Sequence, residues 1–221
     1  MPIKTIFFLF FLLLTPCYNI QSFTLMLDPA GHAKYEGREI DDCFERGLTL
    51  QCAEALKKNL NELYPYVHVV LSRSAGQTVE HLQNAHIANR MKTDLYLSIH
   101  FYQEKEEKPS LYLYQFLYNT ATDFWPYVDN GFSFIPYKHA YRAHTESSYS
   151  YGTNLLQFFN KKKYKRYFDC KGFFGLPCKP LLGINCPALL IEAGLKKRND
   201  WHCLAEALVD ALETIINPDA S

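Results

Sequence analysis

The sequence predicts an α/β fold in which one twisted, mostly parallel sheet carries helices on both faces. Short apolar, β-rich runs alternate with amphipathic helical segments through the first hundred residues. No linker, repeat or low-complexity tract divides the chain. Without an N-terminal leader about 200 residues remain, which is enough for one ordinary domain with a buried core.

The N-terminus predicts a secretory signal peptide over residues 1–22. Lys4 supplies a positive charge, and nine consecutive apolar residues follow from Ile6 to Leu14. Such a run is too short to cross a bilayer, which needs about 20 apolar residues. We therefore expect an exported protein of the periplasm or cell envelope, without stable membrane insertion. The LTPC string makes a lipid anchor on Cys17 an alternative, but Pro16 stands where that signal needs a small residue.

The elements of the predicted sheet follow in order. Residues 23–27 (FTLML) predict a first strand, and residues 41–63 predict an amphipathic helix because their apolar residues recur every three or four positions. A strand (VHVVLSR), a helix over residues 78–91 and a strand (DLYLSIH) come next. Near the C-terminus, PALLIEAG predicts a strand and residues 200–216 a helix. This alternation is typical of a parallel sheet flanked by helices.

Residues 101–174 predict an aromatic-rich insertion within a domain that spans residues 23–221. In it, SLYLYQFLY predicts a strand, NLLQFFNKKKYKRYF a helix with a basic outer face, and EKEEK a solvated loop. The aromatic cluster between residues 124 and 137 favours core or loop packing over stacking on sugar rings. His139 and His144 do not share a helical face, so we expect ordinary surface histidines.

The charge balance argues against nucleic acid as a partner, and the cysteine spacing argues against a cysteine zinc site. The chain has 23 basic and 23 acidic residues, so a general electrostatic attraction to nucleic acid is not expected. Six cysteines follow Cys17, and an even number in an exported protein permits disulfides. Cys170 and Cys178 are a plausible local pair, whereas Cys52 falls on the apolar stripe of a helix. The absence of a CxxC motif disfavours a cysteine zinc site.

Four polar residues stand next to the predicted strands: His32 after FTLMLDPAG, Glu45 in DDCFERG, His100 closing DLYLSIH and Glu192 closing PALLIEAG. Ligands of open α/β sheets bind at the carboxyl ends of the strands. Two histidines and a glutamate can hold zinc, and a second glutamate can act as base. The local HExxH motif is absent, so distant segments would have to assemble this site. Alternatively, these are solvated strand ends, and Glu45 is a carboxylate favoured by a helix N-terminus.

Taken in order, these segments resemble the zinc-dependent N-acetylmuramoyl-L-alanine amidases, a family of bacterial cell-wall hydrolases. LDPAGH resembles the family's LDPGH, VVLSR its LTR strand, and AHIANRMKTDLYLSIH its IAN…ADLFISIH. DDCFERGLTLQCAEALKKNL is similar to its glutamate-bearing first helix, and INCPALLIEAG to its P-x-L-L-V-E-x-G-F. The resemblance covers most of residues 23–100 and 183–215.

The resemblance implies that His32, Glu45 and His100 hold Zn²⁺ and that Glu192 is the catalytic base. It further implies hydrolysis of the amide between N-acetylmuramic acid and L-alanine in peptidoglycan. We expect a monomer, and the sequence leaves open whether an activator protein is needed.

Three departures from the family pattern leave other functions open. Aligned without a gap, LDPAGH places Gly31 at the family's first histidine, so His32 must reach the metal through a turn one residue longer. Ala33 and Lys34 replace the usual glycines, and LKKRN replaces F-x-S-N after Gly194. The alternatives are an inactive protein that binds cell wall or regulates an amidase, and a zinc peptidase of similar architecture.

Overall fold

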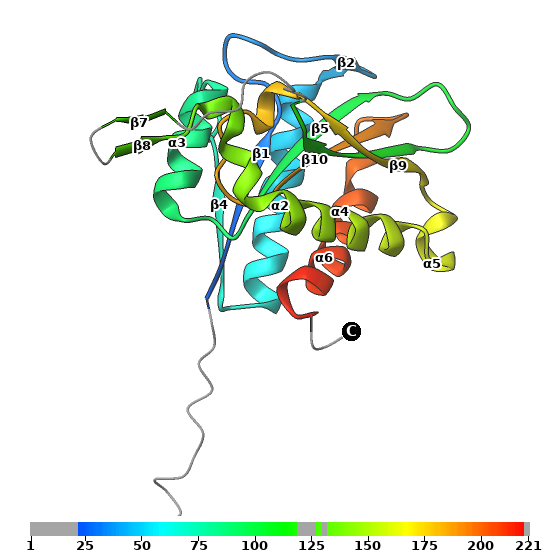
Figure 1. The fold of residues 1–221 in the computed structure, drawn as a ribbon. Helices are drawn as coiled ribbons and strands as arrows, with labels where there is room; N and C mark the ends of the chain where they lie inside the picture. The colour runs from blue at the N-terminus through cyan, green and yellow to red at the C-terminus, as the bar shows by residue number, and fades with distance from the viewer. Residues whose placement is uncertain (1–21, 119–126, 130–131, 219–221) are drawn as a thin grey trace, which may run out of the picture.

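A six-stranded sheet runs through the centre of the computed structural model, which describes residues 22–118, 127–129 and 132–218 (Figure 1). The strands lie in the order β4 (Val67–Leu71), β1 (Phe23–Pro29), β5 (Leu95–Gln103), β10 (Ala188–Leu195), β6 (Ser110–Phe116) and β9 (Asp169–Leu176). The first four are parallel, whereas β6 runs antiparallel to β10 and parallel to β9. The predicted single, mostly parallel sheet is confirmed.

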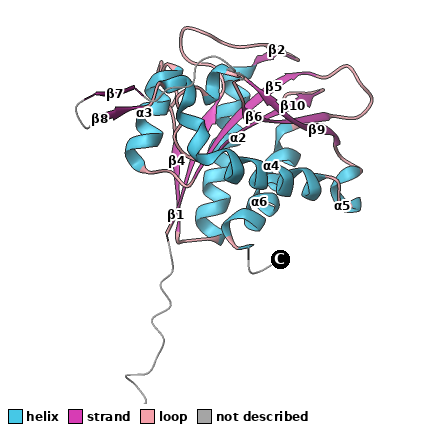
Figure 2. Cartoon of the chain, in the orientation of Figure 1, coloured by secondary structure: helices cyan, strands magenta, loops and turns pink. Residues whose placement is uncertain are grey.

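Helices cover both faces of this sheet (Figure 2). The covering helices are α2 (Glu45–Leu63), α4 (Thr145–Phe159) and α6 (Trp201–Ile216) on one face, and α3 (His81–Met91) with the 3-10 helix η2 (Lys179–Leu181) on the other. Leu25, Leu97 and Ile191 point to the first face, and Met26 and Tyr96 to the second. The central strands are buried on both sides, which explains why they form continuous apolar runs rather than alternating ones.

The remaining elements are β2 (Glu39–Ile40), β3 (Cys43–Phe44), β7 (Tyr127–Asp129), β8 (Phe132–Phe134), the 3-10 helix η1 (Tyr137–His144) and α5 (Lys162–Lys165). Helix α2 begins four residues later than predicted because the β2–β3 hairpin occupies the preceding positions. Its turn passes through Asp41, whose φ of 55° is left-handed. The helix predicted over residues 154–168 is instead two helices that break after Phe159.

The six cysteines of the described chain are all free thiols. Cys170 lies in β9 and Cys178 lies beyond the end of that strand. A strand rises about 3.3 Å per residue, so these two residues are held far apart and the expected local pair does not form. Cys52 is fully buried in α2, and the prediction that it is a packed core residue is confirmed.

His139 and His144 in η1 were both predicted to be surface histidines. His139 is only 7% exposed, so the prediction is wrong there, and His144 is half-buried.

The predicted signal peptide lies outside the described residues except for its last position, residue 22. Within the described ranges, every helix falls short of the length and apolar character needed to cross a bilayer.

The turn between β5 and β6 is organised by a buried carboxylate. Glu104 accepts hydrogen bonds from the backbone N–H groups of Lys105 (2.8 Å), Glu106 (3.0 Å) and Ser110 (2.8 Å). Burial by itself would raise the pKa of Glu104, but these N–H groups lower it to about 2. Lys105 and Glu106 are exposed, as expected of a solvated EKEEK loop, whereas Glu104 is structural.

We predict that Glu104→Gln destabilises the fold at neutral pH and that this penalty disappears in acid. A carboxylate whose folded pKa is depressed stabilises the fold above its unfolded pKa, and loses this effect as pH falls toward about 2. Urea unfolding of both proteins across this pH range measures the difference. The exposed variant Glu106→Gln is the control, and a penalty independent of pH would contradict the prediction.

Candidate active site

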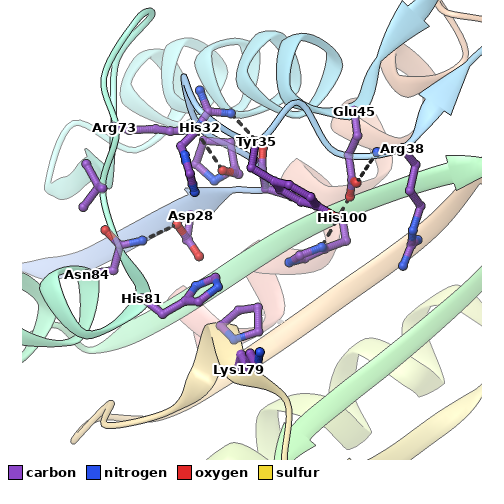
Figure 3. A pocket seen from close by; sticks show the side chains of 15 residues that line it. Asp28, His32, Tyr35, Arg38, Glu45, Arg73, His81, Asn84, His100 and Lys179 are labelled. Carbon is purple, nitrogen blue, oxygen red and sulfur yellow. Dashed lines mark hydrogen bonds and ion pairs between the residues drawn. The ribbon is translucent and has the colours of Figure 1, made fainter.

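A cavity of about 360 Å³ opens at the carboxyl ends of β1 and β5, the edge where the sequence analysis expects a ligand (Figure 3). Polar side chains from several elements line it. They are Asp28, His32, Tyr35, Arg38, Glu45, Arg73, His81, Asn84, His100 and Lys179. Three of the four predicted site residues therefore share one cavity.

Glu45 is the first residue of α2 and is only 4% exposed. Its Oε1 accepts a hydrogen bond from the Phe101 N–H (3.0 Å), and its Oε2 accepts one from the Arg38 N–H (3.2 Å). Burial acts to raise the pKa of Glu45, but His100 and these N–H groups outweigh it, so the pKa lies below its usual range. A Cβ at Gly37, where φ is +80°, would lie 2.7 Å from Oε2, so only glycine lets this loop approach the carboxylate.

His100 closes β5 beside Glu45. Its Nδ1 lies 3.3 Å from Glu45 Oε1, and its buried Nε2 has no hydrogen-bond partner in the described chain. Charge-assisted N–H···O bonds are usually 2.7–2.9 Å long, so this contact is long for one. Two donors at 2.0–2.1 Å from one tetrahedral zinc ion would be separated by about 3.3 Å. The spacing and chemistry of this pair therefore fit two ligands of one zinc ion.

His32 reaches the same cavity from the turn that follows β1. Gly31 in this turn has a left-handed φ of +78°, and a Cβ there would lie 2.9 Å from Arg46 Cβ. The His32 N–H donates to the Tyr35 carbonyl (2.8 Å), and the Tyr35 N–H donates back to the His32 carbonyl (3.0 Å). The imidazole Nδ1 accepts a hydrogen bond from the Lys34 N–H at 3.3 Å. The Nδ1 atom therefore points toward the backbone of the turn that carries His32.

The three expected ligands are therefore only partly assembled. Glu45 and His100 are neighbours, whereas His32 lines the cavity without joining them. In the part of the chain that the structure describes, no group of three His, Cys, Asp or Glu side chains is gathered closely enough to hold a metal ion. The zinc assignment remains a prediction.

Glu192 lies on β10, directly across from His100 in the parallel register. Paired residues on neighbouring strands point to the same face, so the Glu192 carboxylate stands beside the cavity. Its Oε1 accepts a hydrogen bond from Arg38 Nη1 (2.6 Å), and its Oε2 accepts one from the Tyr114 hydroxyl (3.2 Å). Burial and the Glu192 charge raise the pKa of Tyr114, so it remains a proton donor here.

The two hydrogen-bond partners of Glu192, Arg38 and Tyr114, were not predicted from the sequence. Arg38 lies in an irregular loop and Tyr114 in β6, and neither position carries a local pattern that marks a site. His81, the first residue of α3, was also missed. Burial lowers the pKa of His81 below its usual value, so the ring is a neutral donor or acceptor in the cavity wall.

Asp28, which belongs to the LDPAGH segment, links several elements at the floor of the cavity. Its carboxylate is 5% exposed and accepts hydrogen bonds from Ser72 Oγ (2.6 Å), Asn84 Nδ2 (2.8 Å) and Ser98 Oγ (3.1 Å). Arg73 closes the neighbouring turn by donating to the carbonyls of Pro29 (3.0 Å) and Ala30 (2.8 Å). These bonds join β1, β4, β5 and α3 beneath the site.

Comparison with known proteins identifies the family of this chain. The family model of N-acetylmuramoyl-L-alanine amidase matches residues 25–210, which is most of the chain. The chain is a member of the N-acetylmuramoyl-L-alanine amidase family. The expected family is thereby confirmed.

One individual amidase is similar to about a third of this chain. The N-acetylmuramoyl-L-alanine amidase CwlM of Bacillus licheniformis is 38% identical over 76 residues, which are 34% of this chain and 30% of CwlM. The matched segment thus spans less than a third of that relative's length.

Solved amidase structures share the fold. An N-acetylmuramoyl-L-alanine amidase of Clostridium difficile 630 is similar with a TM-score of 0.65 at 21% identity, over 90% of this chain and 98% of that one. The CwlD amidase of Clostridioides difficile, solved in complex with the GerS lipoprotein, has a TM-score of 0.62 at 12% identity, over 89% and 99% of the two chains.

We predict that Asp28→Ala lowers the free energy of unfolding by about 3 kcal/mol, because three buried donors lose their acceptor. Denaturant unfolding measures it. The control is Asp42→Ala, which removes an exposed ion pair with Arg198 and should cost about 0–1 kcal/mol. Equal losses in the two variants would contradict the assigned role of Asp28.

Proposed function

We propose that this protein is a zinc-dependent hydrolase that cleaves the amide between N-acetylmuramic acid and L-alanine in peptidoglycan. His32, Glu45 and His100 would hold the metal, and Glu192 would be the base. The observation that carries the proposal is the juxtaposition of the 3.3 Å His100–Glu45 pair with Glu192, which faces His100 across neighbouring strands. Family membership supports the choice of bond.

When bound, zinc would polarise the scissile carbonyl and lower the pKa of a water molecule. The chain's own residues would transfer the proton. Glu192 accepts it from the attacking water, whose oxygen bonds to the carbonyl carbon, and passes it to the alanine nitrogen as the C–N bond breaks. Tyr114 holds Glu192 Oε2 in place by its hydroxyl.

Arg38 must yield its position for this to occur. Its side chain is 48% exposed whereas that of Glu192 is 20% exposed, so the guanidinium is the accessible partner that substrate can displace from Glu192 Oε1. Until then, the Arg38 guanidinium holds Glu192 Oε1 at 2.6 Å.

An inactive wall-binding or amidase-regulating protein is the second candidate function. It is favoured by the His32 ring nitrogen that faces its own turn and by the Arg38 contact on the proposed base. Metal analysis separates the two functions: one zinc per purified chain supports the enzyme, and no zinc at any loading supports the binding protein.

Export and an activating partner are further parts of the proposal. The apolar run from Ile6 to Leu14 supports export to the periplasm or cell envelope. The GerS lipoprotein bound to the CwlD amidase supports a search for a protein activator of this chain.

We predict that purified peptidoglycan is digested by the protein, that a chelator stops digestion and that added zinc restores it. The released peptides should begin with L-alanine, because cleavage at the lactyl amide leaves that amino group free. Mass spectrometry of the soluble products tests the bond. Cuts within the stem peptide would indicate a peptidase, and full activity with chelator would contradict zinc dependence.

We predict that Glu192→Gln lowers kcat about 10²–10⁴-fold, because glutamine cannot take the proton, while bound zinc is unchanged. Turnover of a muramyl peptide and metal content are measured together. Glu206→Gln, an exposed position on α6, is the control. Wild-type turnover by Glu192→Gln would refute the role of Glu192 as base.

A further inference from the structure

A row of aromatic rings extends from Glu192 across the far half of the sheet. We call it the aromatic shelf, and it consists of Tyr102 on β5, Tyr112 and Tyr114 on β6, and Phe174 on β9. Tyr112 lies opposite Glu192 in the ladder between β6 and β10, and Tyr114 lies opposite Phe174 in the ladder between β6 and β9. Cross-strand partners share a face, so the shelf and the candidate active site lie on the same side of the sheet.

The rings of the shelf contact one another in sequence. Tyr112 and Tyr114 are within 11° of parallel with centroids 6.3 Å apart, and the Phe174 centroid lies 5.9 Å from that of Tyr114. Tyr102 lies 6.5 Å from Tyr112 at the other end. A Cβ at Gly172, beside Tyr112, would lie 2.9 Å from the Phe174 ring, so glycine keeps this surface free of a further side chain.

The shelf is open to solvent. Phe174 is 42% exposed, and the three tyrosines are half-buried. The opposite face of β9 is covered instead, because Phe173 there packs against Tyr149 of α4. Contiguous exposed aromatic surface on a folded protein is typical of a binding site.

The shelf is continuous with the proposed catalytic group. Tyr114 donates its hydroxyl proton to Glu192 Oε2, and Arg38, the other partner of Glu192, lies over the Tyr102 ring at 5.9 Å. Phe174 is two strands away from β10, or roughly 10 Å. A ligand on the shelf would therefore lead directly into the site.

The two sides of Glu192 differ in polarity. The cavity side carries charged groups of both signs, among them Arg38, Glu45 and Lys179, which suit a polar stem peptide. The shelf side presents uncharged rings, whose faces suit the apolar C–H faces of neutral pyranose rings. The proposed substrate also has two unlike sides, because a glycan lies on one side of the scissile amide and a peptide on the other.

We infer that the aromatic shelf binds the glycan strand of peptidoglycan by stacking its sugar rings, while the stem peptide enters the cavity. The inference rests on the proposed function, because it takes Glu192 as the point where the two halves of the substrate meet. It makes this protein selective for muramyl peptides that carry neighbouring sugars.

The test uses the full chain and two substrates that share one stem peptide. One is a muramyl peptide with a single sugar, and the other is a glycan strand of several disaccharides. Removal of a stacked ring in Tyr112→Ala or Phe174→Ala should raise KM for the strand roughly three- to tenfold. KM for the single-sugar substrate should stay unchanged, and kcat should stay unchanged on both.

Binding of a peptide-free oligomer of N-acetylglucosamine, measured by calorimetry, gives a readout that needs no turnover. Its affinity should fall by the same factor in both variants. Tyr149→Ala is the matched control, because this ring is 59% exposed but lies with Phe173 on the opposite face of β9. Phe174→Leu removes the ring but keeps an apolar side chain. Thermal unfolding of each variant shows whether it is folded.

The outcomes separate the two proposals. Wild-type KM and wild-type oligomer affinity in the Tyr112→Ala/Phe174→Ala double variant would overturn the shelf, as would an equal loss on the single-sugar substrate. Shelf-dependent binding of the oligomer by a protein that cleaves neither substrate would refute the amidase proposal and leave the shelf standing.

Discussion

The buried carboxylate of Glu45 is the constraint on which this site depends. An unpaired carboxylate cannot stay away from water without a large cost, so Glu45 draws the N–H groups of Arg38 and Phe101 and the His100 ring around itself. These contacts pin the loop before α2 to the end of β5. Because Arg38 is held by its backbone, its guanidinium reaches Glu192, and Glu192 in turn contacts Tyr114, where the aromatic shelf begins.

The same arrangement divides the site into two unlike halves. On one side, Asp28 and Arg73 use buried hydrogen bonds to fix a charged cavity above the ends of β1 and β5. On the other side, antiparallel β6 and edge strand β9 carry aromatic rings on the face that Glu192 shares. A parallel sheet that ended at β10 would have a cavity but no shelf, so the two added strands give the site its second half.

The turn after β1 depends on Gly31. Its backbone is left-handed, and the paired hydrogen bonds between His32 and Tyr35 close the turn. His32 is thereby brought to the cavity wall while its Nδ1 stays engaged with Lys34. Of the three expected ligands, Glu45 and His100 owe their proximity to regular elements, whereas the position of His32 is set by an irregular turn.

The sequence alone predicted the sheet apart from edge strand β9, the helices that cover it and the edge where His100 and Glu192 lie, because apolar runs and helical periodicity show which segments are buried. It also determined that Cys52 is a core residue. The tertiary structure was needed to show that Arg38 meets Glu192 across 154 positions, that Asp28 binds Ser72 from a distant segment and that Tyr112 lies opposite Glu192. Contacts between distant segments depend on strand order and register, which no local pattern encodes, and for the same reason Cys170 and Cys178 stay apart although they are close in sequence.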